Sequence, residues 1–184
     1  MSEAERNGPC LSPVRAFFPL LLLFFCLFAF SCSSPFDGKK FEGADRAAHE
    51  VMRAIDSGAG YQLFGEALHQ LSEEVSLLKR TVMPGREEEL FRVYDDLLTI
   101  FRDGQILWKY KAEFVYYGFV PEGMIYVGQD IEPIVAKYGI PTEAHLFKPT
   151  RQAWRSIPDS SIVVIWKNAH SRLTIIENIL KNRE

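Results

Sequence analysis

Cysteine is scarce in this chain and is missing from everything after residue 32. The three cysteines are Cys10, Cys26 and Cys32, so no disulfide can form within the region that follows them. An excess of positive charge is missing too, since 21 Lys and Arg stand against 24 Asp and Glu, for a net charge of -3. Nucleic-acid-binding domains present a strongly basic surface. We therefore expect no nucleic-acid partner.

The short motifs of catalysis and cofactor binding are absent as well. The sequence has no glycine-rich phosphate loop, no Cys-x-x-Cys pair, no haem attachment sequence and no Gly-x-Ser-x-Gly elbow. Glu66 and His69 have the Glu-x-x-His spacing of di-iron helical bundles, but such bundles need two copies and two further glutamates. The other histidines also lack ligand spacing: His49, His145 and His170. We therefore predict no metal and no other cofactor, and nothing in the sequence points to an enzyme.

Charge is absent from the fifteen residues Ala16–Phe30. This apolar run has arginines upstream and the small residues Ala29 and Ser31 at its end, which is the pattern of a secretory signal peptide. A membrane-spanning helix needs about 20 apolar residues, and this run is shorter. The pattern predicts that residues 1–31 are a cleaved signal peptide, with an uncleaved anchor as the alternative.

Cys32 stands directly after this run. A cut between Ser31 and Cys32 would remove the other two cysteines and leave an unpaired thiol, which is unusual in an exported protein. The stretch Ala29-Phe30-Ser31-Cys32 resembles the lipobox of bacterial lipoproteins, in which the cysteine is diacylated at sulfur and becomes the acylated N-terminus. Ala29 and Ser31 would also suit the ordinary signal peptidase, which would give the same cut without lipid.

The resemblance implies where the protein is located. Lipid on Cys32 would make the membrane its first partner, and two or three acyl chains would hold it durably. Ser33, rather than Asp, after the cysteine is what the family's sorting rule associates with the outer membrane, facing the periplasm. Residues 32–44 are rich in turn formers and lack periodicity, which predicts a tether.

Apolar residues recur at helical spacing from Asp45 onward. Asp45 is predicted to cap a first helix that ends near residues 57–60. The second helix carries a regular apolar seam, with steps of three and four residues: Phe64, Leu68, Leu71, Val75, Leu78 and Val82. Such a seam is typical of helices packed side by side.

Two further helices are predicted downstream. Pro84 and Gly85 end the second helix, and the triplet 87–89 of glutamates suits the positive dipole end of a third. The apolar phase continues past Gly104, which favours one long, bent helix. The fourth follows Pro158, with Asp159 or Ser160 as the cap, and its seam runs over Ile162, Trp166, Ala169, Leu173, Ile176 and Leu180.

The segment between residues 115 and 157 is interrupted by glycine and proline. It leaves room for a brief extended piece at 124–127 and a short helix near 131–138, ended by Gly139. The segment and its neighbours are dense in aromatic residues, of which four are selected as a possible partner or ligand face: Tyr116, Tyr117, Tyr126 and Trp154. Aromatic residues with a polar tip are favoured at such surfaces, although they also fill the ends of cores.

Residues 45–184 are therefore predicted to form an all-α, antiparallel bundle of about four main helices with an irregular, aromatic-rich crossover at 115–157. The expected function is that of a lipid-anchored, non-enzymatic module of the bacterial cell envelope that binds another envelope protein. The alternative is a periplasmic carrier or sensor that holds a small ligand in an aromatic pocket between the bundle and the crossover.

Overall fold

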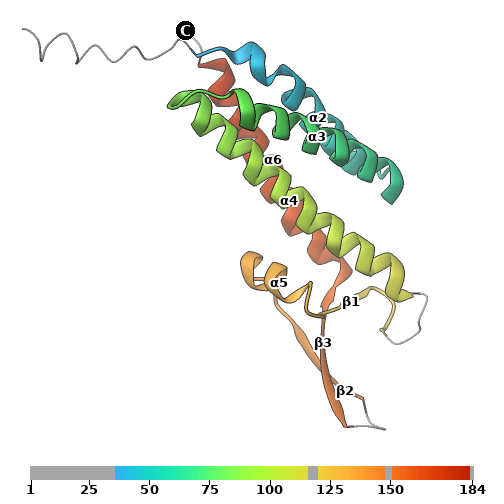
Figure 1. Ribbon diagram of the computed structural model, residues 1–184. Coiled ribbons are helices and arrows are strands. Elements are labelled where there is room, and N and C mark those ends of the chain that lie inside the picture. Colours follow the sequence, from blue (N-terminus) through green and yellow to red (C-terminus); the bar gives the residue numbers. More distant parts are fainter. Residues whose placement is uncertain (1–35, 116–119, 148–150, 183–184) are drawn as a thin grey trace, which may run out of the picture. The chain divides into compact units, whose positions relative to one another are not determined.

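The computed structural model describes residues 36–115, 120–147 and 151–182. The chain divides into two units, Met1–Pro35 and Phe36–Glu184, and only the second contains described residues. Its helices are α2 (Glu42–Asp56), α3 (Tyr61–Thr81), α4 (Arg86–Val115), α5 (Glu132–Tyr138) and α6 (Ile162–Lys181). Its strands are β1 (Met124–Tyr126), β2 (Glu143–Phe147) and β3 (Gln152–Pro158) (Figure 1).

Four long helices pack together as the sequence predicted. α3 lies against α2 and α4, and α4 lies against α6. The connections between α2 and α3 and between α3 and α4 are short, which makes consecutive helices antiparallel neighbours. His49 Nε2 of α2 and Glu177 Oε1 of α6 lie 3.4 Å apart, so α2 also meets α6.

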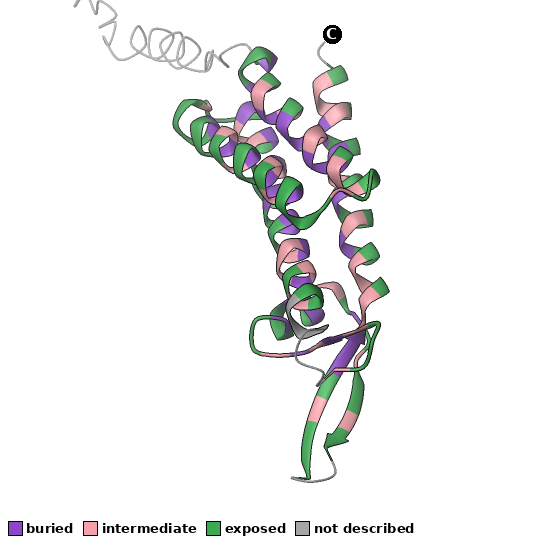
Figure 2. Ribbon diagram, turned by 90° about the vertical axis from the view of Figure 1, so that its right-hand side faces the viewer, coloured by how far each residue is buried: buried purple, intermediate pink, exposed green. Residues whose placement is uncertain are grey.

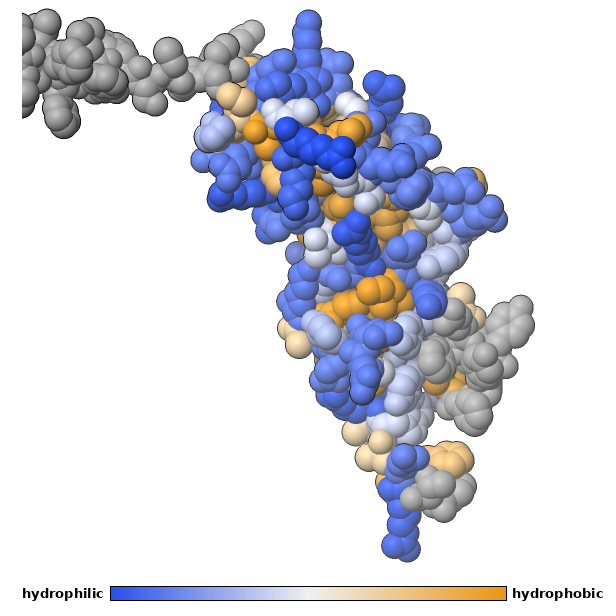
Figure 3. Space-filling view, in the orientation of Figure 1, coloured by the Kyte–Doolittle hydropathy of each residue, from blue (hydrophilic) through white to orange (hydrophobic). Residues whose placement is uncertain are grey.

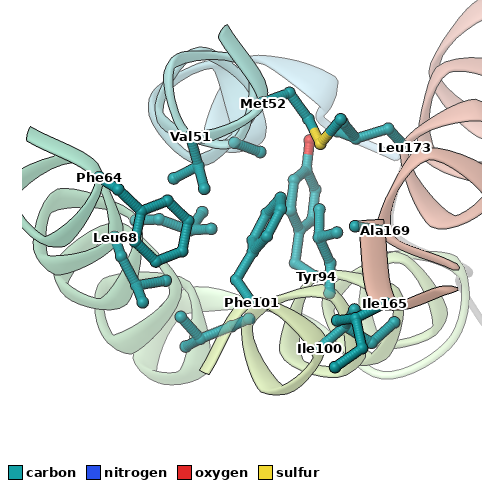
Figure 4. Packing of buried hydrophobic residues seen from close by; sticks show 14 of the residues in the cluster. Val51, Met52, Phe64, Leu68, Tyr94, Ile100, Phe101, Ile165, Ala169 and Leu173 are labelled. Carbon is teal, nitrogen blue, oxygen red and sulfur yellow. The ribbon is translucent and has the colours of Figure 1, made fainter. Parts of the chain in front are cut away.

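The apolar seams meet in one hydrophobic core. Tyr94 and Phe101 of α4 are fully buried and point toward α2, which carries Val51 and Met52, with residues of α3 and α6 on either side (Figure 4). Five of the six predicted seam residues of α3 are buried, and Val82 packs against the core at its edge. Figure 2 shows the buried stripe along each long helix, as expected for amphipathic helices.

The folded unit begins earlier than the sequence predicted. Residues 38–44 were assigned to the tether, but Gly38–Phe41 forms a 3-10 turn that leads directly into α2. The reason is Phe41, which is fully buried and stacks on Tyr94 with ring centroids 5.9 Å apart. One aromatic residue within a polar stretch leaves no periodic signal, so the tether prediction was wrong for these residues.

The predicted N-terminal caps of two helices were also wrong. Asp45 lies inside the first turn of α2 and accepts a hydrogen bond from Tyr94 Oη at 3.2 Å, so it joins two helices instead of capping one. Before α6, residues 159–161 form a 3-10 turn, and Asp159 pairs with Lys111 Nζ at 2.8 Å. Both acidic side chains lie near helix starts and were predicted to be caps, but each instead contacts a residue of α4.

α4 runs without interruption through Gly104, as predicted. The glycine is needed because the Trp166 ring of α6 lies where a side chain at position 104 would begin. Trp166 also contacts Trp108 and Phe64, with ring centroids 6.5 and 5.7 Å away. Gly104 therefore permits the close approach of α4 and α6.

A three-stranded antiparallel sheet corrects the all-α prediction. The strand order is β1-β3-β2, and Tyr126 lies opposite Ser156 while His145 lies opposite Trp154. The extended piece at 124–127 and the short helix α5 were foreseen, and Gly139 ends α5 in the left-handed conformation. β2 and β3 were missed because they contain few of the β-branched residues that mark strands. The described fold is a mainly helical unit with a small sheet.

Candidate functional site

One face of the sheet gathers aromatic side chains, and we call it the aromatic face: Tyr126, His145, Phe147 and Trp154. Residues that lie opposite each other in an antiparallel pair project from the same face of a sheet. The register therefore places Tyr126 of β1, His145 and Phe147 of β2 and Trp154 of β3 on one side. His145 stacks on Trp154 with ring centroids 4.2 Å apart, and Tyr126 lies 6.2 Å from Trp154.

A buried serine fixes the centre of this face. Ser156 is fully buried, and its hydroxyl donates to Met124 Sδ at 3.7 Å while lying 2.8 Å from His145 Nε2. The direction of the hydrogen bond between this hydroxyl and His145 Nε2 follows the tautomer of the imidazole. The imidazole is thereby held in one orientation against Trp154.

The opposite face of the sheet is anchored to the helical unit. Ile125 and Ile157 are fully buried on that side, and β1 lies against α4. Arg155 projects from the same side and donates to Glu132 of α5. The hydrogen bond from the Arg155 guanidinium lowers the pKa of the Glu132 carboxyl.

Three further hydrogen bonds hold the α5 region against α4. Asp103 accepts from Lys137 Nζ at 2.7 Å and from Tyr138 Oη at 2.9 Å. Burial of the phenol, together with its bond to Asp103, raises the pKa of Tyr138. Tyr110 Oη of α4 donates to Asp130 just before α5, at 2.8 Å. The base of the sheet is therefore tied to the long helix at several points.

The hairpin of β2 and β3 is much more exposed than the helices. None of the residues of β2 is buried, and the exposed fractions of Leu146 and Phe147 are 60% and 48%. Figure 2 shows this hairpin as mainly exposed, and Figure 3 shows hydrophobic colour on it as well as in patches among the largely hydrophilic helices. Exposed apolar and aromatic residues on an anchored strand pair are typical of contact surfaces.

The structure brings together only part of the predicted site. Tyr126 and Trp154 lie next to each other, whereas Tyr116, Tyr117 and Cys32 fall outside the described residues. His145 and Phe147 were missed. The signal that could have found them is Pro149, which stands between two short runs that contain aromatic residues, since proline often marks a boundary between elements.

Two aromatic residues that flank the predicted segment, Trp108 and Trp166, are partly buried and pack against the core. Trp108 and Trp166 pack against Phe64 of α3, with ring centroids 5.3 and 5.7 Å from it. For these residues the interpretation as core packing is correct. The aromatic residues in and around this segment therefore form two separate groups, one packed against the helical core and one on the sheet.

The Glu-x-x-His motif forms no metal centre in the described structure. His69 lies 3.4 Å from Glu73 on the same helix, and Glu66 accepts from Gln62 at 3.1 Å. Among residues 36–115, 120–147 and 151–182, no group of three His, Cys, Asp or Glu side chains is placed to hold a metal ion. An open groove of about 440 Å³ is lined by residues of α2 and α3, many of them charged.

The comparisons with known proteins gave no match. No protein-family model matches the chain, and neither a curated protein nor a solved structure does. None of the helices in the described part of the chain is long and apolar enough to cross a membrane.

Proposed function

We propose that this protein is a lipid-anchored module of the bacterial cell envelope that binds another envelope protein through the aromatic face. The observation that carries the proposal is the placement of Trp154 between His145 and Tyr126 on a partly exposed sheet face, beside the exposed Phe147. Interface hot spots are enriched in tryptophan and tyrosine. Side chains that are already held in place lose less conformational entropy when a partner binds.

The anchor follows from the sequence around Cys32. The residues between Cys32 and the folded unit, which begins at Phe36, number only three. An extended chain spans at most about 3.5 Å per residue, so lipid on Cys32 would hold the unit close to a bilayer. Two or three acyl chains would make this attachment durable, because each buried methylene contributes about 0.8 kcal/mol.

Gln152 and Ala153 provide a matched test of the partner surface. Both are exposed neighbours on β3, but Gln152 projects from the aromatic face and Ala153 from the opposite one. With a photo-crosslinking amino acid at position 152, we expect one major crosslinked protein in the cell envelope, and at position 153 we expect little. Electrophoresis and mass spectrometry of the products measure both yields.

Removing the central aromatic residue should abolish that crosslink. Trp154→Ala in the Gln152 crosslinking variant is expected to reduce its yield about 30-fold, since loss of a hot-spot residue costs about 2 kcal/mol or more. Leu77→Ala on α3, a residue with an exposed fraction of 55%, is the control and should leave the yield unchanged. Equal yields from positions 152 and 153, or an unchanged yield after Trp154→Ala, would contradict the proposed surface. A co-purified small molecule in place of a protein would favour the carrier.

A further inference from the structure

Strand β2 forms an open edge of the sheet. In the order β1-β3-β2 it has a neighbour on one side only, and within the described residues β3 alone packs substantially against it. The direction of its backbone groups follows from the bond that Val127 N donates to Arg155 O at 2.9 Å. Successive residues of a strand direct their N–H and C=O groups to alternate sides. Arg155 therefore faces β1, while Trp154 and Ser156 face β2.

The same alternation identifies the free groups of β2. His145 lies opposite Trp154 and is bonded to β3, so Ala144 and Leu146 direct their N–H and C=O groups away from the sheet. Natural edge strands are commonly protected by lysine, proline or a bulge. β2, with the sequence Glu-Ala-His-Leu-Phe, has none of these devices. Its only formally charged residue is Glu143 at one end.

We propose that β2 pairs antiparallel with β2 of a second copy of this chain, about a twofold axis at His145. The result is a continuous six-stranded sheet. In this register Ala144 of each copy forms hydrogen bonds with Leu146 of the other, which gives four backbone bonds across the axis. The proposal does not depend on lipid attachment or on an envelope partner.

The charges on two copies of β2 are compatible with antiparallel pairing. Antiparallel pairing places Glu143 beside Phe147 of the other copy, at the hairpin end where the exposed Arg151 follows the turn. The two Glu143 residues lie about 14 Å apart along the strands, at 3.4 Å per residue. In this register each Glu143 lies beside Phe147 and away from the other Glu143, so like charges do not meet.

The register is restricted because only Ala144 and Leu146 direct their N–H and C=O groups away from β3. A shift of one residue would place the groups already bonded to β3 opposite the free groups of the other copy, and it would turn each side chain toward the wrong face. Pairing about His145 uses all five residues and sets the exposed Leu146 against Ala144. Four backbone bonds make a smaller contact than a standard interface, so the dimer is reversible.

A cysteine at the axis tests this register. Residues that face each other in a non-hydrogen-bonded antiparallel pair have Cα atoms about 4.5 Å apart, which a disulfide can bridge. The full chain with His145→Cys, oxidised with copper phenanthroline at high protein concentration, is expected to yield a disulfide-linked dimer on a non-reducing gel. Glu143→Cys is the control and should yield little dimer, since its sulfur atoms would lie too far apart. The unaltered chain controls for its own three cysteines.

A proline substitution in the edge strand β2 provides a second test. Leu146→Pro added to His145→Cys removes one outward N–H from each copy and is expected to reduce the dimer yield about tenfold, because two interface bonds are lost. Leu146→Val keeps the N–H and should preserve the yield. Circular dichroism confirms that each variant is folded. The proposal is overturned if His145→Cys forms no dimer, if Glu143→Cys forms as much, or if proline and valine behave alike.

Discussion

Glu87→Ala is expected to lower the free energy of unfolding by about 3 kcal/mol, because it removes the buried partner of a partly exposed ion pair and leaves two backbone amides without an acceptor. Glu87 has an exposed fraction of only 4%. Its carboxylate accepts from Lys40 Nζ at 2.9 and 3.1 Å, from the Met83 amide at 2.9 Å and from the Asp37 amide at 3.2 Å. It thus joins the start of the folded unit to the turn before α4.

The neighbouring Glu88 gives a matched control. Its carboxylate is exposed and pairs with Arg92 one helical turn away, at 2.6 Å. Such surface pairs contribute about 0.5 kcal/mol, so Glu88→Ala should change stability little. Urea titrations of the two variants measure both values. A loss below about 1 kcal/mol for Glu87→Ala, or equal losses for both variants, would show that Glu87 does not hold this junction.

The contribution of Glu87 should also depend on pH in a defined direction. Burial by itself raises the pKa of the Glu87 carboxyl, but the hydrogen bonds from Met83, Lys40 and Asp37 outweigh burial and hold the pKa below its ordinary value of 4.5. A carboxyl with a lowered pKa stabilises the fold fully above that ordinary value and loses its effect as the pH falls further. The stability difference between the protein and its Glu87→Gln variant should therefore be constant near neutral pH and shrink below about pH 4.5.

Gly104→Ala is expected to lower the free energy of unfolding by about 2 kcal/mol, although alanine in a helix normally gains about 1 kcal/mol over glycine. The added methyl group would overlap the Trp166 ring. That ring is not free to move, because Phe64 and Trp108 pack against it. Overpacking of this kind costs about 1 to 3 kcal/mol or more, which outweighs the gain in helix propensity.

Gly65→Ala on α3 is the control for the glycine effect. A methyl group there would meet only Gln105 Nε2, at an ordinary contact distance of 3.7 Å. We expect Gly65→Ala to stabilise the protein by about 1 kcal/mol, opposite in sign to Gly104→Ala. Thermal unfolding followed by circular dichroism compares the two. A stabilising Gly104→Ala would mean that α4 and α6 are not packed as closely as described.

The helical part of the fold was predictable because its signal is local and repeated. The seam of α3 is read from residues three and four positions apart, and the same spacing carried α4 through Gly104. Gly139 marked the end of α5 because its left-handed conformation is favoured by glycine. In each case neighbouring residues along the chain contain the information.

The features that were missed depend on partners far away in the sequence. Phe41 becomes part of the core only because Tyr94 lies beside it, and β2 and β3 have a strand pattern too weak to be read alone. The pairing of Tyr126 with Trp154 across two strands required the register of the sheet. For the candidate site, the sequence therefore predicted that aromatic residues take part, but it did not predict which of them lie side by side.

The central claim is that lipid on residue 32 holds this folded unit beside a bilayer, and mass spectrometry of the protein purified from its native membrane tests it most directly. The account predicts an N-terminal peptide that begins at Cys32 and carries acyl chains, and a Cys32→Ala variant that lacks them. An unmodified thiol at Cys32, or a chain that still begins at Met1, would contradict it.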